Sequence, residues 1–395
     1  MGPSRHPVVH NSNDGSCFDR HIPPSIAVIA GTRPEFIKLA PVIQEIRQLL
    51  GDNFVRVYST GQHRSLLQQA TNALHVRVDY DFDLMTHAQS ASEIQRRVVS
   101  ASDHAFKEHR PELVIVQGDT VSAFGGAMAA YLNMIPIVHI EAGLRTHNTH
   151  NPWPEEGLRQ MISRIATWHL APTTLSRTNL LEEGISADRI HIVGNPGIDS
   201  LVNTLKQNST EPLHIPGLDI TKPWVIVTMH RRESLHGALD LFCQSLKSAM
   251  AAYPDLQVVW PLHPNPAVKS TVVRHMGHRG QSPILFCDPL PFHQLAPLVS
   301  GAQMVITDSG GLQEEAPYSG VPVIIIRDCT ERQEVIDLGL GLLAGADGRG
   351  LLSSFEHFLN TPVDKKSVKV WQNMQGNGRS SKKIAHHVKS FVSSE

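Results

Sequence analysis

The chain has 395 residues, enough for two or three domains and a large buried core. Its 35 basic and 37 acidic residues give a net charge of −2 at pH 7 without a long basic block, which argues against binding of nucleic acid through bulk electrostatics. The sequence shows neither an apolar run of about 18 residues nor an apolar signal core, so we expect no membrane-spanning helix. Four cysteines without CxxC spacing indicate a reducing compartment, and we expect a cytoplasmic protein.

After a polar stretch, residues 1–24, that we expect to be a flexible extension, short apolar runs alternate with amphipathic stretches. The apolar runs are rich in Val and Ile, which is typical of buried parallel strands. In the first half they predict strands at Ile26–Ala30, Phe54–Thr60, Leu113–Gln117, Ile137–Glu141 and Arg189–Val193. Helical patterns separate them at Pro34–Leu50, Ala91–His109, Val121–Asn133 and Glu155–Ala166.

A second series of the same kind follows a polar, proline-containing stretch at residues 206–221. Its predicted strands are Trp224–Met229, Gln257–Pro261, Ile284–Cys287, Met304–Thr307 and Val323–Ile326. Its predicted helices lie near Ala238–Ala252, Gln294–Ser300 and Leu312–Ser319. The fold class is therefore α/β, with two doubly wound Rossmann-like domains facing across a cleft.

We expect the domains at residues 25–205 and 206–379. The tail, residues 380–395, predicts a helix that packs back on the first domain.

Polar and small residues stand directly after many of the predicted strands, where open α/β sheets bind ligands. These strand ends are Gly31–Glu35, Gly118–Thr120, Glu141–Arg145, His230–Glu233, His263–Pro266 and Asp308–Gly311. One such end carries little meaning. Several ends at a shared crevice predict a binding site.

The turn Asp308–Gly311 has two glycines between a strand and a helix. They permit close approach of a ligand, and the helix N-terminus favours a phosphate. Glu315, one turn into the helix, would reach sugar hydroxyls. The alternative is a tight turn in which Ser309 is an ordinary N-cap.

The stretch Thr32–Glu35 fits a capping box, with Pro34 in the first helical turn. Arg33 and Lys38 do not serve the cap, because the helix dipole disfavours positive charge at this end. A nearby anion would offset that cost. The alternative is a pair of solvated side chains.

Asp119, Glu141 and Glu155, with His230 from the second domain, would suit acid–base chemistry, and clustered acids raise one another's pKa. Alternatively, Asp119 only caps the helix that follows, and Glu155 is a common acid of a first helical turn.

No set of side chains has metal-ligand spacing, and no dinucleotide fingerprint follows a strand, so we expect neither a metal nor a cofactor.

With these residues assembled, the chain resembles the non-hydrolysing UDP-N-acetylglucosamine 2-epimerases. The resemblance is carried by GTRPEFIKLAPVI (31–43), TGQHR (60–64), VQGDT (116–120), HIEAGLRT (139–146), PWPEE (152–156), VTMHRRES (227–234), TDSGGLQEEAP (307–317) and RDCTERQE (327–334). It implies a glycosyltransferase-B fold, a homodimer and interconversion of UDP-GlcNAc and UDP-ManNAc, which supplies ManNAc-type sugars for surface polysaccharide.

The same resemblance implies roles for individual residues. Its catalytic residues are Asp119, Glu141, Glu155 and His230. Its substrate-binding residues are Arg33, Lys38, Phe292 near uracil, Ser309, Gly310, Gly311, Glu315 at the ribose and Arg332. Some bacterial relatives bind a second UDP-GlcNAc as an activator, and the corresponding residues here are Gln62, His63, Arg64, Arg231 and His263.

Departures from the family pattern leave other functions open. The chain is shorter between Asp288 and Phe292, where relatives have a glutamine that holds uracil, and Ser65 replaces an acid or amide after the QHR triplet. The alternatives are a 2-epimerase of a related UDP-2-acetamido sugar, a hydrolysing epimerase, a glycosyltransferase of the same fold, and a non-catalytic nucleotide-sugar sensor. The tryptophan of PWPEE and the three acids favour the GlcNAc epimerase.

Overall fold

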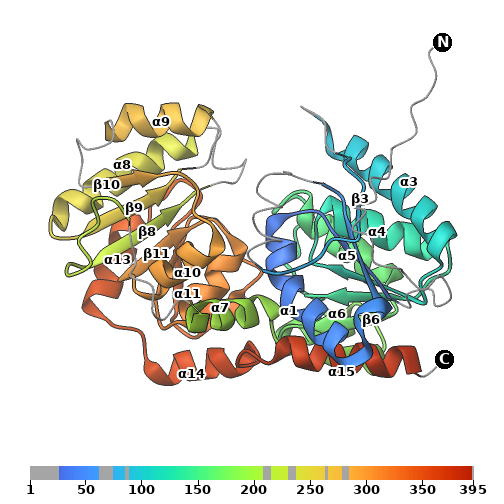
Figure 1. Cartoon of the computed structure of the whole chain (residues 1–395). Helices are drawn as coiled ribbons and strands as arrows, with labels where there is room; N and C mark the ends of the chain where they lie inside the picture. Colours follow the sequence, from blue (N-terminus) through green and yellow to red (C-terminus); the bar gives the residue numbers. More distant parts are fainter. Residues whose placement is uncertain are drawn as a thin grey trace, which may run out of the picture. The chain divides into compact units, whose positions relative to one another are not determined.

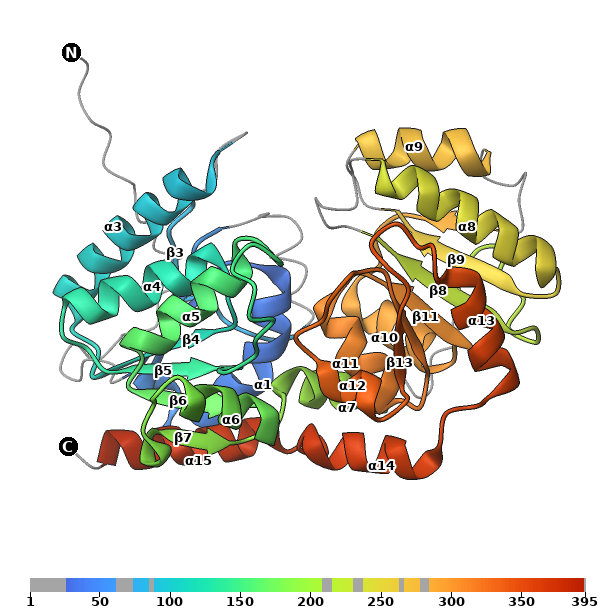
Figure 2. The ribbon, with the colours of Figure 1, turned by 180° about the vertical axis from the view of Figure 1, so that it is seen from behind.

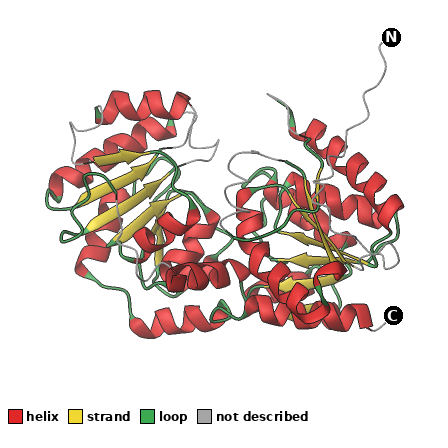
Figure 3. Ribbon diagram, in the orientation of Figure 1, coloured by secondary structure: helices red, strands yellow, loops and turns green. Residues whose placement is uncertain are grey.

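Parallel β-sheets with helices on both faces build the protein, as the alternating apolar runs predict (Figure 1, Figure 3). The computed structural model describes residues 26–61, 74–84, 89–207, 215–229, 237–262, 266–277 and 284–393. These residues form two compact units. The first holds the chain up to Ser200 and from Met374 onward, and the second holds Leu201–Asn373.

The first unit contains a sheet of seven described strands, all paired in parallel. In spatial order they are β3 (Tyr80–Asp81), β2 (Val55–Ser59), β1 (Ile26–Ala30), β4 (Leu113–Gln117), β5 (Ile137–Ile140), β6 (Trp168–Ala171) and β7 (Ile190–Ile192). The helices are α1 (Arg33–Leu50), α3 (Ala91–His109), α4 (Val121–Leu132), α5 (Glu155–Ile165), α6 (Thr174–Glu182) and α15 (Ser380–Ser393), with short turns η1 (Asp52–Phe54) and η2 (Ala187–Arg189).

Both faces of this sheet are buried, because alternate side chains of each strand point to opposite faces. Ile26 and Val28 of β1 share an apolar cluster with side chains of α1 and α15. Ala27 and Ile29 of the same strand pack with side chains of α3 and α4. This explains why β1 has no polar residue, and why its predicted bounds are confirmed.

The second unit repeats the plan with six described strands, again all parallel. In spatial order they are β10 (Ile284–Cys287), β9 (Gln257–Pro261), β8 (Trp224–Thr228), β11 (Met304–Thr307), β12 (Val323–Ile325) and β13 (Gly341–Leu343). The helices are α8 (Ala238–Ala252), α9 (Pro266–Met276), α10 (Phe292–Ser300), α11 (Gly310–Tyr318), α12 (Gln333–Asp337), α13 (Leu351–Asn360) and α14 (Lys365–Met374). The remaining helix, α7 (Pro196–Gln207), contains the boundary between the units.

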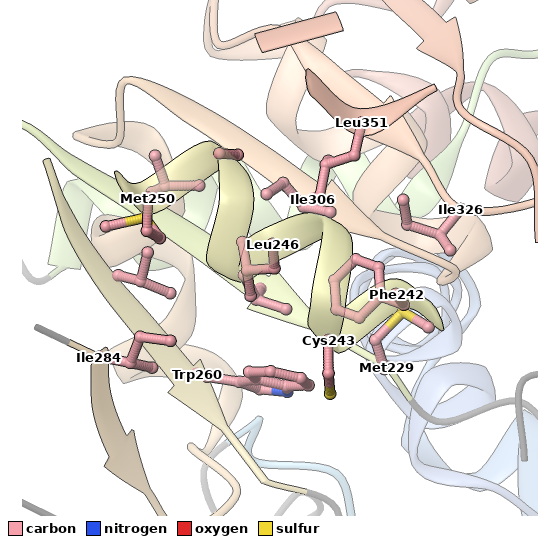
Figure 4. Packing of buried hydrophobic residues seen from close by; sticks show 14 of the residues in the cluster. Met229, Phe242, Cys243, Leu246, Met250, Trp260, Ile284, Ile306, Ile326 and Leu351 are labelled. Carbon is pink, nitrogen blue, oxygen red and sulfur yellow. The ribbon is translucent and has the colours of Figure 1, made fainter. Parts of the chain in front are cut away.

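One core layer of the second unit lies between its sheet and the helices α8, α9 and α13, all visible from behind in Figure 2. Phe242 of α8 and Trp260 of β9 are both fully buried and meet edge to face, with ring centroids 5.7 Å apart (Figure 4). Burial of each such aromatic side chain stabilises the fold by about 2–3 kcal/mol. The other face of the sheet packs on α10 and α11, the helices that follow its ligand edge.

The helix α15 returns from the C-terminal end of the chain to pack on α1. Its first two backbone amides donate to the carboxylate of Asp199: Ser380 N lies 3.2 Å and Ser381 N 2.8 Å from its oxygens. Burial raises the pKa of Asp199, and these hydrogen bonds oppose that rise. A buried acid thus satisfies the start of a helix about 180 residues further along the chain.

Some elements were not predicted. The strands β3, β6 and β13 are short, and β6 contains a histidine, so none of the three shows a long apolar run. The helices α6, α7, α9, α12, α13 and α14 were also missed. The predicted strand Ile137–Glu141 ends one residue early, because Glu141 adopts a φ of 67° and a left-handed residue cannot continue a strand.

Two histidines of the first sheet make its stability depend on pH. His139 on β5 and His169 on β6 are register partners, with exposed fractions of 0% and 1%. Burial lowers the pKa of His139 to about 3 and that of His169 to about 4. The unfolded chain therefore binds more protons than the folded chain below about pH 6.5. The stability from each histidine is complete above that pH and falls by about 1.4 kcal/mol per unit as the pH drops.

The matching experiment compares urea unfolding of the wild type and His169→Leu between about pH 7.5 and about pH 5. Over this range the free energy of unfolding should fall by about 2 kcal/mol less in the variant than in the wild type. The reason is that the variant lacks His169, which binds a proton in the unfolded chain but not in the folded chain. All other titrating groups are shared, so their effects cancel in the difference. Equal pH dependence of the two proteins would contradict the assignment.

Candidate active site

The site residues of the first unit lie at its topological switch point. The strand order reverses between β1 and β4, and ligands bind at such points beyond the carboxyl ends of the strands. Arg33 follows β1 as the first residue of α1, and Asp119 follows β4. Glu141 follows β5, the neighbour of β4. Arg33, Asp119 and Glu141 therefore share one edge of one sheet.

Both carboxylate oxygens of Glu141 are held by donors. Lys38 Nζ lies 2.6 Å from Glu141 Oε1, and both side chains are largely buried, with exposed fractions of 11% and 8%. The amide nitrogen of Gln117 donates to Glu141 Oε2. The Glu141 carboxylate thus offsets the positive charge that Lys38 brings near the start of α1. Together with the left-handed backbone of Glu141, these donors give the carboxylate one orientation.

Asp119 is tied to the helix α5. The guanidinium of Arg159 donates to Asp119 Oδ2, and its Nη1 lies 3.4 Å from Glu156 Oε2. Glu156 is fully buried and also accepts from Thr146 N at 3.0 Å. Because Glu155 is the first residue of this helix, Arg159 connects Asp119 to the element that carries the third predicted acid.

The environment of these acids differs from the sequence interpretation. We expected a cluster of carboxylates, and the structure adds a cation beside Asp119 and another beside Glu141. Gln117 and Arg159 were missed. Gln117 carried a signal, since it is the one polar residue of an otherwise apolar strand. Arg159 carried a weaker one, a basic residue one helical turn after two acids.

The predicted capping box of α1 is confirmed and joins two loops of the site. Thr32 caps the helix, and Glu35 accepts from Gly31 N at 3.0 Å and Thr32 N at 2.6 Å. Its other oxygen accepts from the hydroxyl of Thr120 at 2.7 Å. Burial raises the pKa of Glu35, and these hydrogen bonds oppose the rise. The loops after β1 and β4 are therefore held together by one buried carboxyl group.

The second unit has its own switch point, between β8 and β11. The turn after β11 is shaped by Thr307, whose hydroxyl accepts from Ser309 N at 2.9 Å and lies 2.6 Å from the Thr228 hydroxyl. Ser309 occupies the N-cap position of α11, but within the described residues its side chain makes no capping hydrogen bond. The N-cap position that the alternative gave this serine is therefore confirmed, but the side-chain hydrogen bond of an ordinary cap is not among the contacts described.

The two glycines of this turn are closely packed. A Cβ at Gly310 would lie 3.0 Å from Nη1 of Arg332, and one at Gly311 would lie 3.3 Å from Oε1 of Glu315. Arg332 is 5% exposed and donates to two buried carboxylates, to Glu314 Oε1 at 2.7 Å and to Glu331 Oε1. Arg332 thus packs against the turn from within the protein, and a Cβ at residue 310 would require its guanidinium to move by a few tenths of an ångström.

Of the other predicted site residues, one lies within the residues that the structure describes and six lie outside them. Phe292 is the half-buried first residue of α10. The remaining predicted site residues lie outside the described residues: Gln62, His63, Arg64, His230, Arg231 and His263. In the described ranges, no group of three His, Cys, Asp or Glu side chains is placed to hold a metal ion. No helix in those ranges combines the length and the apolar character needed to cross a bilayer.

Two parallel sheets covered by helices, each with polar turns after its strands at the switch point, define the class of α/β proteins with a glycosyltransferase-B-like fold. The family model for UDP-N-acetylglucosamine 2-epimerase matches residues 51–389. The chain belongs to the UDP-N-acetylglucosamine 2-epimerase family, a family of isomerases.

Named relatives agree with this result. The chain is 36% identical to the UDP-N-acetylglucosamine 2-epimerase of Bacillus subtilis (strain 168), over 92% of this chain and 94% of the relative. The crystal structure of UDP-GlcNAc 2-epimerase from Neisseria meningitidis bound to UDP-GlcNAc is 33% identical, with a TM-score of 0.86 over 92% of this chain and 99% of that chain. The Methanocaldococcus jannaschii enzyme in complex with UDP-GlcNAc and UDP is 27% identical, with a TM-score of 0.82 over the same shares.

Proposed function

We propose that this protein interconverts UDP-GlcNAc and UDP-ManNAc without net hydrolysis. Family membership supports the reaction class, and the Neisseria meningitidis relative binds UDP-GlcNAc. The observation that carries the proposal is the arrangement of Asp119 and Glu141. They stand at adjacent strand ends of the first unit, each held in place by a cation. Such fixed carboxylates suit proton transfer at a defined carbon atom.

The chemistry of inversion at C2 explains why several acids are needed. The C2 hydrogen is not alpha to a carbonyl group, so simple enolisation is not available. Cleavage of the C1–O bond to UDP develops positive charge at C1 and makes the C2 hydrogen acidic. A base then removes it, giving 2-acetamidoglucal and UDP. Protonation of C2 on the opposite face and return of UDP to C1 complete the epimerisation, and no hydride moves.

Within the proposal, the first unit performs the proton transfers. Asp119, Glu141 and Glu155 are the carboxylates near C2, and Lys38 and Gln117 keep Glu141 aimed. Arg33, at the adjacent N-terminus of α1, supplies positive charge for the substrate.

The second unit holds UDP in the proposal. The backbone amides at the start of α11 and the glycines at 310 and 311 suit the diphosphate. Glu315 takes the ribose hydroxyls, and Phe292 lies near uracil. His230 contacts the diphosphate, and the second nucleotide site remains a prediction for residues outside the described ranges.

The proposal includes a cellular setting. The protein would act in the cytoplasm as a homodimer and supply ManNAc-type sugars for surface polysaccharide. The sparse cysteines support a reducing compartment. Analytical ultracentrifugation of the full chain tests the dimer, and a monomer at micromolar concentration would contradict it.

Incubation of the full-length protein with UDP-GlcNAc in deuterated water tests the reaction. We expect UDP-ManNAc that carries deuterium at C2, because the hydrogen added to the second face comes from the solvent. NMR detects this exchange at C2. Free ManNAc would instead show a hydrolysing epimerase. Absence of exchange would favour a glycosyltransferase or a sensor of the same fold. A UDP-diacetamido sugar offered in parallel distinguishes the related substrate.

A further inference from the structure

Three hydrogen bonds tie the loop that carries Asp119 to the strand end that carries Glu141. The backbone amide of Gly118 donates to Ile140 O at 3.0 Å, as a continuation of the sheet. The His139 ring nitrogen Nε2 lies 2.8 Å from Gly118 O. The Gln117 side chain donates to Glu141 Oε2. The two side-chain bonds extend the connection beyond the point where the backbone pairing of β4 and β5 ends.

The geometry makes His139 a donor in this connection. Its side chain is fully buried, and burial keeps the ring neutral by lowering its pKa to about 3. A neutral imidazole carries one N–H. Within the described ranges Nδ1 has no hydrogen-bond partner, whereas Nε2 faces the carbonyl oxygen of Gly118. The proton therefore belongs on Nε2, and the ring fixes the direction of that peptide group.

The backbone on both sides of this connection is in the left-handed region. Gly118 has a φ of 71° and Glu141 a φ of 67°. A Cβ at Gly118 would lie 3.5 Å from Glu141 Oε2, so this glycine packs against the carboxylate. A non-glycine residue such as Glu141 does not prefer the left-handed conformation, so its own backbone preference does not maintain this φ. Surrounding contacts must hold it, and the side chains of His139 and Gln117 supply two of them.

We propose that His139 and Gln117 are positioning residues that fix the carboxylates of Asp119 and Glu141 relative to each other. The inference rests on the proposed epimerase function. In that function, one face of C2 loses a proton and the other face gains one. The two transfers follow each other efficiently only if both carboxylates keep their places around the same carbon atom. A displacement of about 1 Å costs about a hundredfold in rate.

The test is the fate of the intermediate in His139→Leu. We expect kcat to fall about a hundredfold with an unchanged affinity for UDP, because the residues proposed to hold UDP lie in the second unit. We also expect a higher ratio of released 2-acetamidoglucal to UDP-ManNAc, because elimination continues while delivery of the second proton is slow. His139→Gln places an amide N–H at a similar reach and should restore much of kcat and the wild-type ratio.

His169→Leu is the matched control. His169 is equally buried, in register with His139 on the next strand, and no hydrogen bond joins it to the loop after β4 among the contacts of the described residues. It should lose stability but keep the wild-type product ratio. If His139→Leu does not fold, Gln117→Leu replaces it in the test. We expect the same rise in the ratio of released 2-acetamidoglucal to UDP-ManNAc.

The two ideas can fail separately. A wild type that incorporates no deuterium at C2 would overturn the proposed function. Suppose that the wild type does incorporate deuterium at C2. The positioning role alone would then be overturned if the His139→Leu and Gln117→Leu variants kept the wild-type kcat and product ratio. A fall in kcat with an unchanged ratio, shared by His169→Leu, would show a general structural effect and also overturn it.

Discussion

Asp119→Asn is expected to abolish epimerisation while UDP binding is retained. The substitution keeps the shape of the side chain, but an amide cannot accept or return a proton at C2. General acid–base catalysis by one side chain is worth about 10²–10⁴-fold, so we expect kcat to fall by about 10³-fold or more. The measurements are C2 exchange followed by NMR and UDP affinity by calorimetry. Normal turnover would remove Asp119 from the catalytic set.

The structure supplies a reason to expect the variant to fold. Arg159 loses the charge of Asp119 but keeps its contact with Glu156, which lies 3.4 Å from its Nη1. Asp103→Asn makes the same chemical change at a partly exposed position of α3, where Asp103 pairs with the exposed Lys107 at 2.8 Å and accepts from Asn133 at 2.9 Å. Exposed pairs of this kind contribute little, so this control should turn over like the wild type.

Much of the fold could be predicted because its central strands are apolar on both faces. The bounds of β1, β4, β9, β10 and β11 are confirmed as predicted. The prediction failed for β6, where His169 interrupts the pattern. A histidine looks polar in a sequence, whereas this one is buried, and burial there lowers its pKa to about 4. Sequence reasoning could not foresee that burial.

The candidate site shows the same limit. Strand ends are readable from local pattern, so Asp119 and Glu141 could be placed at one sheet edge. Their partners could not, because the contact of Lys38 with Glu141 spans 103 residues, and Arg159 reaches Asp119 across 40. Which donor meets which carboxylate is decided by the packing of α1 and α5 on the sheet, and periodicity does not encode this.

Arg332 provides the second large expected effect, and it separates two roles. The family resemblance assigns Arg332 to the polar end of the substrate. The structure shows its guanidinium between Glu314 and Glu331, with all three side chains at most 6% exposed. Removal of one partner from a buried ion pair costs about 3–5 kcal/mol, because the remaining charge is left in a medium of low polarity. Arg332→Met should therefore lower the free energy of unfolding by that amount in urea titrations.

The companion variants decide which role dominates. Arg332→Lys offers one ammonium group in place of the fork that reaches two carboxylates, so its stability should be intermediate. Arg332→Met combined with Glu314→Gln removes a buried charge and should recover part of the loss. Arg349→Met, which removes an 84% exposed arginine paired with Asp347, should unfold like the wild type. A raised KM with unchanged unfolding in Arg332→Met would instead make substrate contact its main role. If the structural role dominates, Arg332→Met should lower the free energy of unfolding. Its UDP affinity should then fall only as a consequence, because the turn at Gly310 loses the side chain that packs against it.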